Sequence, residues 1–233
     1  MITVAAENYT GEGIYTIPEA SRLTGVDTRT IRRWLLGYDF NSKSGRRSSP
    51  PVWEPQLSKR SGITALGFFD LNEVRFVNEF RQHGVSWKSL RRAVDKAKTL
   101  LNTSHPFALK KFFTDGKTVF AEVARETGER ELLDLVKNQL AFKKVLSPSL
   151  YGDLEFSRDE ILTRWWPLSK KRSVVIDPQR AFGKPIVSNE GVPTEILFRA
   201  YQGSKALNEV AEWYDVTIEA IKDAIAFERG LVA

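Results

Sequence analysis

The chain has 233 residues, of which 42% are hydrophobic and 27% are charged, and it contains no cysteine. This length allows two domains or three small ones, and the absence of cysteine excludes disulfides, thiolate zinc sites, iron–sulfur clusters and a cysteine nucleophile. No apolar run approaches the length of a membrane span, and the first residues lack the pattern of a secretory signal peptide. We therefore expect a soluble, globular protein of the cytoplasm.

The net charge of +6 is distributed unevenly along the chain. Residues 1–104 carry 16 Lys and Arg against 10 Asp and Glu, residues 105–172 carry 13 against 10, and residues 173–233 carry 6 against 9. A basic first half and an acidic end predict a polyanionic partner for the first half only.

Residues 15–38 have the pattern of two short helices joined by a tight turn. Thr16 and Glu19 have the spacing of a capping box, and Thr24, Gly25 and Val26 interrupt the first helix. Asp27 is placed to cap a second helix that begins at Thr28. The sequence therefore predicts a helix–turn–helix at this position.

The second of these helices has two unlike faces. Ile31, Trp34 and Leu35 share one side, whereas Arg29, Arg32 and Arg33 lie roughly on the other. A helix that is held by an apolar face and offers guanidiniums outward suits the DNA major groove. The alternative is an ordinary solvated surface helix.

A basic, hairpin-like segment follows. Residues 41–51 are rich in Ser, Gly, Pro and Arg, and residues 52–57 and 65–70 read as two short strands around a loop. Such a hairpin predicts a wing that contacts phosphates while the helix reads bases. The candidate DNA-binding residues are Thr28, Arg29, Thr30, Arg32, Arg33, Arg46, Arg47, Lys59 and Arg60.

Two further helices complete the first part of the chain. Asp70 and Glu73 repeat the capping-box spacing before a helix that extends to Gly84, and Ser86 is placed to cap the next one. Their expected inward residues are Val74, Val77 and Phe80 in the first, and Leu90, Val94, Ala97 and Leu101 in the second.

Residues 14–101 resemble the N-terminal domain of MerR-type regulators. The resemblance rests on the Tyr-Thr-Ile start and Thr-Gly-Val end of residues 15–26, the Arg-rich helix at 29–33, and Phe68-Phe69-Asp70. It implies a winged helix–turn–helix fold that binds DNA. The chain departs from that family afterwards, because no long dimerising helix follows and no cysteine could bind a metal effector. The resemblance therefore supports DNA binding and not ligand sensing.

The middle of the chain, residues 105–172, predicts an α+β segment without a catalytic site, cofactor or metal. Asp115-Gly116 lies between two aromatic and β-branched runs and favours a hairpin, and residues 129–142 have helical spacing. The carboxylates Asp153, Glu155, Asp159 and Glu160 lack a histidine partner, so a solvated edge is favoured over a metal site.

Residues 173–233 predict a small three-helix, homeodomain-like domain that begins with a short β element. Strands are expected at 174–176 and 186–187, and helices from Thr194, at 205–214 after Ser204, and at 218–228 after Thr217. The expected core residues are Leu197, Ala200, Val210, Ala211, Ile221 and Ile225.

This last part resembles family 433 of the domains of unknown function, which is widespread in VapB-type antitoxins. The motifs are Asp177-Pro178, Gly183-Lys184-Pro185, Gly191-Val192-Pro193-Thr194 and Val210-Ala211 with Tyr214, although residues 189–192 depart from the family's Gly-Thr-Arg-Ile. The resemblance implies a toxin partner with a PIN-like ribonuclease fold. The acidic residues Glu209, Glu212, Asp215, Glu219 and Asp223 would repel phosphates and favour protein contacts.

We interpret the chain as mainly α with small β elements (α+β), divided into a MerR-like DNA-binding domain (1–104), a middle segment (105–172) and an interaction domain (173–233). The preferred function is a non-enzymatic antitoxin that binds its operator as double-stranded DNA and neutralises a PIN-like ribonuclease. The alternative is a MerR-like regulator that senses a small molecule through residues 105–172. A nucleic-acid-processing enzyme is disfavoured because no residues have catalytic spacing.

Two sets of residues are candidates for protein contacts. A cation and an aromatic wedge could block an acidic ribonuclease site, and the segment with both is Arg164, Trp165, Trp166, Lys170, Lys171 and Arg172. Its tryptophans could instead pack the middle segment. A homodimer, or a hetero-oligomer with the toxin, is expected, and the candidate dimer residues are Phe198, Tyr201, Trp213 and Phe227, which could also complete a monomer's core.

Overall fold

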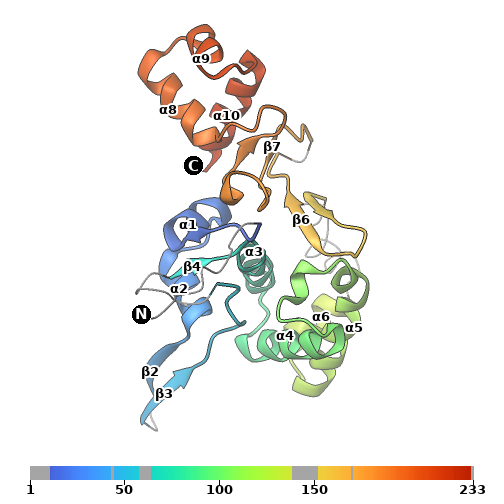
Figure 1. The fold of residues 1–233 in the computed structure, drawn as a ribbon. Helices are drawn as coiled ribbons and strands as arrows, with labels where there is room; N and C mark the ends of the chain where they lie inside the picture. Colours follow the sequence, from blue (N-terminus) through green and yellow to red (C-terminus); the bar gives the residue numbers. More distant parts are fainter. Residues whose placement is uncertain (1–10, 43–44, 58–63, 138–151, 169, 232–233) are drawn as a thin grey trace, which may run out of the picture. The chain divides into compact units, whose positions relative to one another are not determined.

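The computed structural model describes residues 11–42, 45–57, 64–137, 152–168 and 170–231. The fold is mainly helical with small antiparallel strand pairs, which confirms the predicted α+β class (Figure 1). The chain forms two compact units, one of Thr16–Thr163 and one of Met1–Tyr15 with Arg164–Ala233. The division into three domains stays a prediction, and the structure groups most of its first two parts in the larger unit.

The larger unit begins with the predicted helix pair, α1 (Ile17–Thr24) and α2 (Thr28–Leu36), after the short strand β1 (Tyr15–Thr16). The capping box is confirmed, since the Thr16 amide donates to Glu19 Oε2 at 2.7 Å and the Glu19 amide donates to Thr16 Oγ1. Gly25 ends α1 with φ of 70°, and Asp27 Oδ1 accepts from the Arg29 amide at 3.0 Å. Both predicted boundaries of the turn are therefore confirmed.

A β-hairpin follows, but not at the predicted positions. Strands β2 (Tyr38–Ser42) and β3 (Gly45–Ser49) pair antiparallel, with Tyr38 opposite Ser49. The predicted strand at 52–57 is wrong, because these residues form no strand, and the predicted strand at 65–70 is confirmed only for β4 (Ala65–Leu66), because a helix begins at Phe68. Residues 52–57 form a loop whose apolar side chains Val52, Trp53 and Leu57 are buried in the core. Both faces of the β2–β3 hairpin are largely exposed, so its sequence shows no alternation of apolar and polar residues.

Helices α3 (Phe68–Gln82) and α4 (Trp87–Leu101) come next. The N-cap of α3 is Gly67, and Asp70 accepts from the Gly67 amide at 2.9 Å from the third helical position. The predicted start at Asp70 is therefore wrong by about one turn, because Asp70 completes the cap from inside the helix. Ser86 caps α4 as predicted, and the expected core residues Val74, Val77, Phe80, Leu90, Val94 and Ala97 are buried, whereas Leu101 is only half-buried.

The middle of the chain is helical where a hairpin was predicted. After η1 (Pro106–Ala108), the helix α5 (Lys111–Thr127) runs through Asp115 and Gly116, and α6 (Arg130–Lys137) follows. The hairpin prediction fails because Phe112 and Phe120 fall on one helical face and are buried, and the Phe120 ring stacks on Phe80 at 4.3 Å. Tertiary burial of that face outweighs the local turn preference.

The larger unit ends with two short strands. Strands β5 (Leu154–Phe156) and β6 (Leu162–Trp165) pair, and β6 runs into the smaller unit. The predicted helix at 129–142 is confirmed as far as Lys137, and its remaining residues lie outside the described part of the chain.

The smaller unit contains strands β7 (Val174–Val175) and β8 (Ile186–Val187), which pair antiparallel around η2 (Ala181–Gly183). Its three helices are α8 (Thr194–Ser204), α9 (Leu207–Tyr214) and α10 (Ile218–Gly230), as predicted. Thr217 caps α10 as predicted. Ser204 instead ends α8, and the residue before α9 is Ala206, which has no capping side chain.

Residues near the start of the chain belong to this smaller unit as well. The Tyr15 hydroxyl donates to the Gly183 carbonyl at 2.9 Å, and the Ile14 amide donates to the Phe182 carbonyl at 3.1 Å. A Cβ on Gly183 would lie 2.3 Å from the Tyr15 oxygen, so the close approach requires glycine. Among the described helices, none is both long and apolar enough to cross a membrane.

Candidate nucleic-acid interface

Helix α2 has the two unlike faces that the sequence predicts. Ile31 and Leu35 are almost completely buried and Trp34 is 6% exposed, so this side anchors the helix in the larger unit. On the other side Arg29, Arg32 and Arg33 are exposed, together with Thr28 at the helix start, and Thr30 is half-buried. No carboxylate in the described residues forms an ion pair with these three arginines. Their charges are therefore available to an anionic partner.

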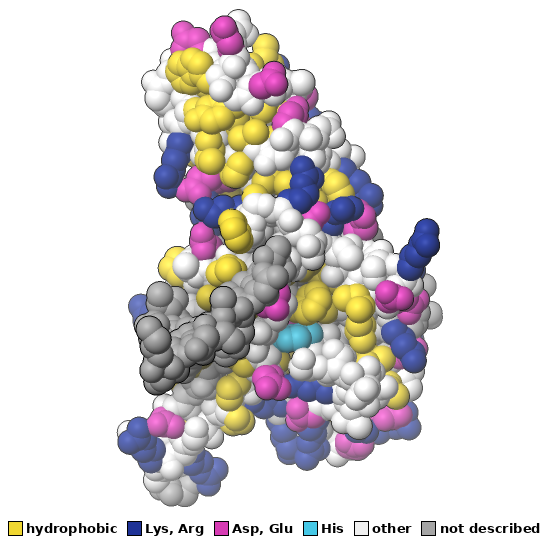
Figure 2. All heavy atoms as spheres, viewed as in Figure 1, with side chains coloured by type: hydrophobic (Ala, Val, Ile, Leu, Met, Phe, Trp, Pro, Cys, Tyr) yellow, Lys and Arg dark blue, Asp and Glu magenta, His cyan; other side chains and the backbone are white. Residues whose placement is uncertain are grey.

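The hairpin continues the basic surface directly after α2. Arg46 and Arg47 are exposed on β3, and Figure 2 shows Lys and Arg side chains at the far end of the hairpin, at the lower left. Arg46 Nη2 lies 2.7 Å from Asp39 Oδ2. Both side chains are at least half exposed, and an ion pair of this kind contributes little to stability. The predicted phosphate contacts Lys59 and Arg60 lie outside the described residues.

Two features fix the hairpin beside α2. Gly37 ends the helix with φ of 71°, and a Cβ there would lie 2.4 Å from the Ser49 carbonyl oxygen, so only glycine allows this close return of the chain. Arg91 of α4 then binds the end of the hairpin, with Nη1 to the Pro51 carbonyl at 2.8 Å and Nη2 to the Pro50 carbonyl at 2.7 Å. This role of Arg91 could not be predicted from local sequence, because its partners are about forty residues away along the chain.

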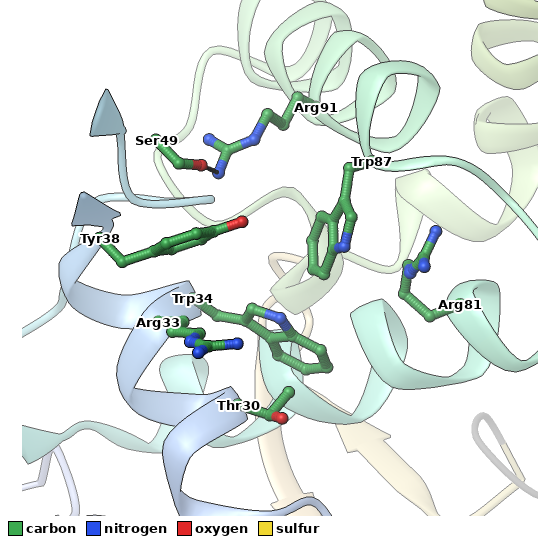
Figure 3. Close-up of a pocket in the computed structure, with 8 residues that line it drawn as sticks. All are labelled: Thr30, Arg33, Trp34, Tyr38, Ser49, Arg81, Trp87 and Arg91. Atoms are coloured by element: carbon green, nitrogen blue, oxygen red, sulfur yellow. Dashed lines mark hydrogen bonds between the residues drawn. The ribbon is translucent and has the colours of Figure 1, made fainter. Parts of the chain in front are cut away.

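A pocket of about 310 Å³ lies where α2, the hairpin and α4 meet, and none of its polar lining outside α2 was predicted. Figure 3 shows the rings of Trp34, Tyr38 and Trp87 around it, with the Tyr38 hydroxyl directed inward. The remaining lining residues are Thr30, Arg33, Ser49, Arg81 and Arg91. A concave site with aromatic walls therefore lies beside the exposed arginine face of α2.

Buried titratable groups at the start of α3 hold the segment that follows the hairpin. Asp70 accepts from Trp53 Nε1 at 2.9 Å and from the Gln56 amide at 3.0 Å, and burial raises its pKa to about 6. His105 Nδ1 lies 4.0 Å from Asp70 Oδ1, and burial lowers the pKa of His105 to about 4. Burial also raises the pKa of Glu73 well above its ordinary value.

Asp70 and His105 are expected to make opposite contributions to the pH dependence of stability. Burial raises the pKa of Asp70 in the folded state from 3.8 to about 6. Its contribution to the free energy of unfolding is therefore full below pH 4 and is lost as pH rises through 6. The folded pKa of His105 is lowered from 6.5 to about 4, so its contribution is full above pH 6.5 and is lost as pH falls through 4. The two largely cancel between pH 4 and 6.

Single substitutions should reveal each contribution. In Asp70→Asn, the free energy of unfolding should gain a slope of up to about +1.4 kcal/mol per pH unit between pH 4 and 6, and in His105→Gln a slope of similar size and opposite sign. Urea unfolding of both variants and of the wild type at four pH values measures these slopes. Slopes that match the wild type in both variants would contradict the assigned pKa shifts.

The candidate toxin-binding segment is engaged with its own unit. Arg164 Nε lies 2.8 Å from Oδ2 of the buried Asp177, and Trp165 is 6% exposed. Lys171 Nζ lies 3.0 Å from Glu219 Oε1 and 2.9 Å from Asp223 Oδ1. Arg172 and Lys170 are exposed, and the Arg172 guanidinium lies 5.3 Å from the centre of the half-buried Trp166 ring.

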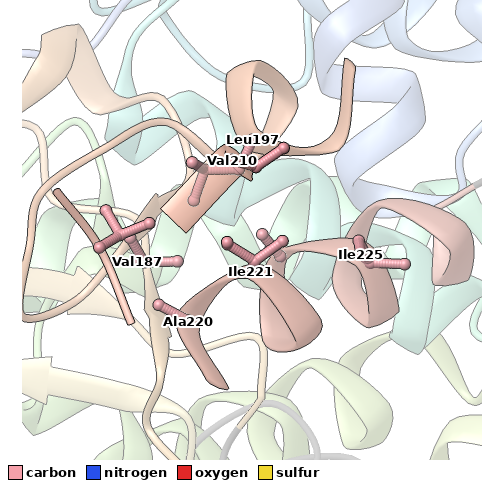
Figure 4. Packing of buried hydrophobic residues seen from close by; sticks show 8 residues of the cluster. Val187, Leu197, Val210, Ala220, Ile221 and Ile225 are labelled. Carbon is pink, nitrogen blue, oxygen red and sulfur yellow. The ribbon is translucent and has the colours of Figure 1, made fainter. Parts of the chain in front are cut away.

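The candidate dimer residues differ in exposure. Phe198 and Tyr201 pack against the core cluster that includes Leu197, Val210 and Ile221 (Figure 4). Phe227 is 5% exposed and completes the core of this unit, whereas Trp213 is 59% exposed. Ile196, Tyr214 and Ile218 are further exposed hydrophobic side chains of this unit, and Figure 2 shows hydrophobic side chains gathered over α8 and α9.

The described residues contain no group of three or more His, Asp or Glu that could hold a metal ion.

Comparisons with known proteins extend over nearly the whole chain. It is 28% identical over 233 residues to the Mycobacterium tuberculosis (strain ATCC 25618 / H37Rv) protein named "Putative antitoxin VapB45", covering 91% of this chain and 92% of that protein. It is 22% identical over 229 residues to "Uncharacterized protein Rv2308" of the same strain, covering 93% and 90%. The crystal structure of Rv2018 from Mycobacterium tuberculosis superposes with a TM-score of 0.69 and 25% identity, over 91% of this chain and 96% of that one.

The C-terminal part of the chain also matches a family. Residues 174–227 match the family described as "Protein of unknown function (DUF433)". This confirms the resemblance that the motifs from Asp177 to Tyr214 indicate. The chain therefore contains a DUF433 domain, which covers β7, β8, α8, α9 and α10 as far as Phe227.

Proposed function

We propose that this chain is a non-enzymatic antitoxin that binds the operator DNA of its own operon and neutralises a PIN-like ribonuclease. The observation that carries the DNA-binding part is the arginine face of α2, which is exposed and continues into an exposed basic hairpin. The toxin–antitoxin part is supported by the DUF433 domain and by the name of the 28% identical relative.

In this proposal α2 enters the major groove and the hairpin acts as the wing of a MerR-like winged helix–turn–helix. An arginine on a helix can bind the O6 and N7 atoms of guanine with two hydrogen bonds, which suits Arg29 and Arg33. Arg46 and Arg47 are placed on the hairpin and would contact phosphates, which fix the register of the protein without reading sequence. Base reading and phosphate contact are thus assigned to different elements.

Dimerisation would give the operator complex its specificity. One helix and one hairpin form a small footprint, and specific operators are usually bound as two half-sites by a symmetric dimer. We place the dimer contact on the smaller unit, around Trp213 of α9, because this residue is 59% exposed. Further exposed hydrophobic residues are Ile196 on α8, Tyr214 on α9 and Ile218 on α10. The exposed acidic residues Glu209 and Glu212 on α9 make the same surface a poor partner for DNA.

Operator binding is tested by titrating the full chain into fluorescently labelled duplexes. The promoter fragment of the chain's own operon should bind at least about a thousandfold more tightly than a random duplex of the same length at physiological salt. Equal affinity for both duplexes would contradict the proposal. If an adjacent reading frame encodes a PIN-like protein, that protein is the toxin to use in the second test.

Toxin binding should depend on Lys170 and Arg172, which are exposed, more than on their neighbours. The variant Lys170→Ala with Arg172→Ala is expected to weaken capture of the co-expressed toxin at least about tenfold, because a cation placed against the toxin's carboxylates would be lost. Arg164→Ala and Lys171→Ala are poorer tests, since they would also remove ion pairs to Asp177 and Asp223.

Lys222→Ala provides the control for this experiment, because Lys222 is an exposed cation on α10 of the same unit. Quantitative co-purification, with thermal unfolding to verify the fold, compares the variants. If the double variant retains toxin at the wild-type level, the toxin contact lies elsewhere on this chain.

A further inference from the structure

The pocket beside α2 is lined by residues from five elements of the larger unit, namely α2, β2, β3, α3 and α4, and three of its lining residues are aromatic. The rings of Trp34 and Trp87 meet edge to face with centroids 5.4 Å apart, and Tyr38 opens the hairpin on the other side (Figure 3). Trp34 is buried and held by α2, and Trp87 is the first residue of α4. Rigid rings on two helices provide faces on which a planar ligand can stack.

The charge of this pocket is strongly positive. Its eight lining residues include Arg33, Arg81 and Arg91 and no carboxylate. Arg81 donates to the Val85 carbonyl, and Arg91 donates to backbone carbonyls and to Ser49 Oγ at 3.0 Å, so among the described residues the hydrogen-bond acceptors of both are neutral. Arg33 lies with its guanidinium carbon 5.2 Å from the Tyr38 ring centre. The pocket is therefore lined by three guanidiniums and no carboxylate, and the carboxylate of Glu129, which interacts electrostatically with Arg81, lies outside the lining.

From this geometry we propose that the pocket binds a mononucleotide, with the base stacked against the tryptophan and tyrosine rings and the phosphate bound by the arginines. Stacking accepts any base because each has a π-face, and guanidiniums bind phosphate with paired hydrogen bonds. The volume of about 310 Å³ is at the lower end of the range for small-molecule sites, so it fits one ring system and one anionic group. The pocket lies within residues 30–91, outside the 105–172 segment that the sequence-based alternative assigns to sensing.

Occupancy of the pocket would regulate the α2 surface, and this consequence rests on the proposed function. Arg33 belongs both to the exposed face of α2 and to the pocket lining. When the phosphate binds Arg33, that guanidinium is withdrawn from DNA and its charge is neutralised. Nucleotide and operator should therefore weaken each other's binding by the same factor, since coupling between two sites is reciprocal.

The first experiment measures nucleotide binding without DNA, by isothermal titration calorimetry of the full chain. Adenosine 5′-monophosphate, guanosine 5′-monophosphate, cytidine 5′-monophosphate and uridine 5′-monophosphate are the probes, with adenosine and inorganic phosphate as halves of the ligand. We expect saturable binding of the monophosphates and at least about tenfold weaker binding of either half. Absence of saturable binding for all four monophosphates up to millimolar concentration overturns the proposal.

Matched variants then locate the site. Arg33→Ala should weaken the nucleotide at least about tenfold, whereas Arg32→Ala should not, because Arg32 is the exposed neighbour on the same helix and does not line the pocket. Both substitutions are on the helix surface and leave its buried face intact. Equal losses in the two variants would indicate general charge attraction and overturn the site.

The last experiment tests the coupling. Trp87→Leu removes one wall of the pocket and leaves the exposed α2 arginines unchanged, so operator affinity without nucleotide should be retained while inhibition by nucleotide is lost. If the variant unfolds, the Arg33→Ala and Arg32→Ala pair still decides the site. Nucleotide binding by a chain that fails to bind its operator would refute the proposed function alone, and operator binding that no nucleotide affects would refute the coupling alone.

Discussion

Replacing Arg29 and Arg33 together by alanine is expected to cost about 2–6 kcal/mol of specific binding to the operator. Each guanidinium that reads a base edge contributes about 1–3 kcal/mol, and the two residues are exposed on the same surface of α2. The loss should be confined to the specific duplex, because binding to random DNA depends mainly on total charge. Anisotropy titrations with promoter and random duplexes, at two salt concentrations, measure both the specific and the charge-dependent part of the binding free energy.

Two single variants separate base reading from charge. Arg47→Ala, on the hairpin, should weaken promoter and random duplexes about equally and lower the salt slope by about one unit. Arg92→Ala removes an exposed charge from α4 outside the lining of the pocket and should change neither specificity nor affinity by more than a few tenths of a kcal/mol. If the α2 double variant lost affinity for both duplexes equally, α2 would be a phosphate contact and not a reading helix.

Phe107→Ala should destabilise the whole larger unit by about 3–5 kcal/mol. Phe107 is 1% exposed in η1, and its ring centre lies 5.2 Å from that of Phe76 and 4.6 Å from that of Phe112. Truncation of a fully buried phenylalanine removes its transfer free energy and leaves a cavity between α3 and α5. Because residue 107 lies in the part that the sequence assigns to a separate middle segment, the substitution also tests whether that segment folds with the DNA-binding helices.

Denaturant unfolding followed by tryptophan fluorescence gives the free energy, and operator titration reports whether the helix pair is lost in the same transition. Phe182→Ala is the matched control, since Phe182 is 69% exposed and belongs to the smaller unit. It should change the free energy of unfolding by less than about 0.5 kcal/mol. Retention of operator binding under conditions that unfold α5 in Phe107→Ala would show that residues 16–104 fold independently.

The parts of the fold that could be predicted from the sequence are those that local residues determine. Thr16 with Glu19, Asp27 and Thr217 each satisfy backbone donors within three residues, and all three caps are present in the structure. The apolar spacing of α2 likewise predicts its buried face. These features depend on short-range geometry, which a sequence displays directly.

The failures have one physical cause, which is that distant contacts decide the outcome. Asp115-Gly116 is a strong hairpin signal, but burial of Phe112 and Phe120 against α3 and η1 imposes a helix. The β2–β3 hairpin has exposed side chains on both faces, so no periodic pattern marks it. The pocket could not be predicted either, because Arg33, Arg81 and Arg91 are separated by up to 58 residues and are brought together only by packing.

The contact of residues 11–15 with the Gly183 region makes Thr16–Thr163 an insertion within the smaller unit. Two covalent crossings, near residues 15 and 164, therefore join the units. A cut near residue 15 would leave Thr16–Thr163 covalently joined to Arg164–Ala233, whereas after a cut near residue 164 the two fragments would be held together only by the contacts of residues 11–15 with the Gly183 region. The two activities proposed for this chain should therefore stay on one molecule after a cut near residue 15, whereas after a cut near residue 164 they should separate once the contacts of residues 11–15 are disrupted.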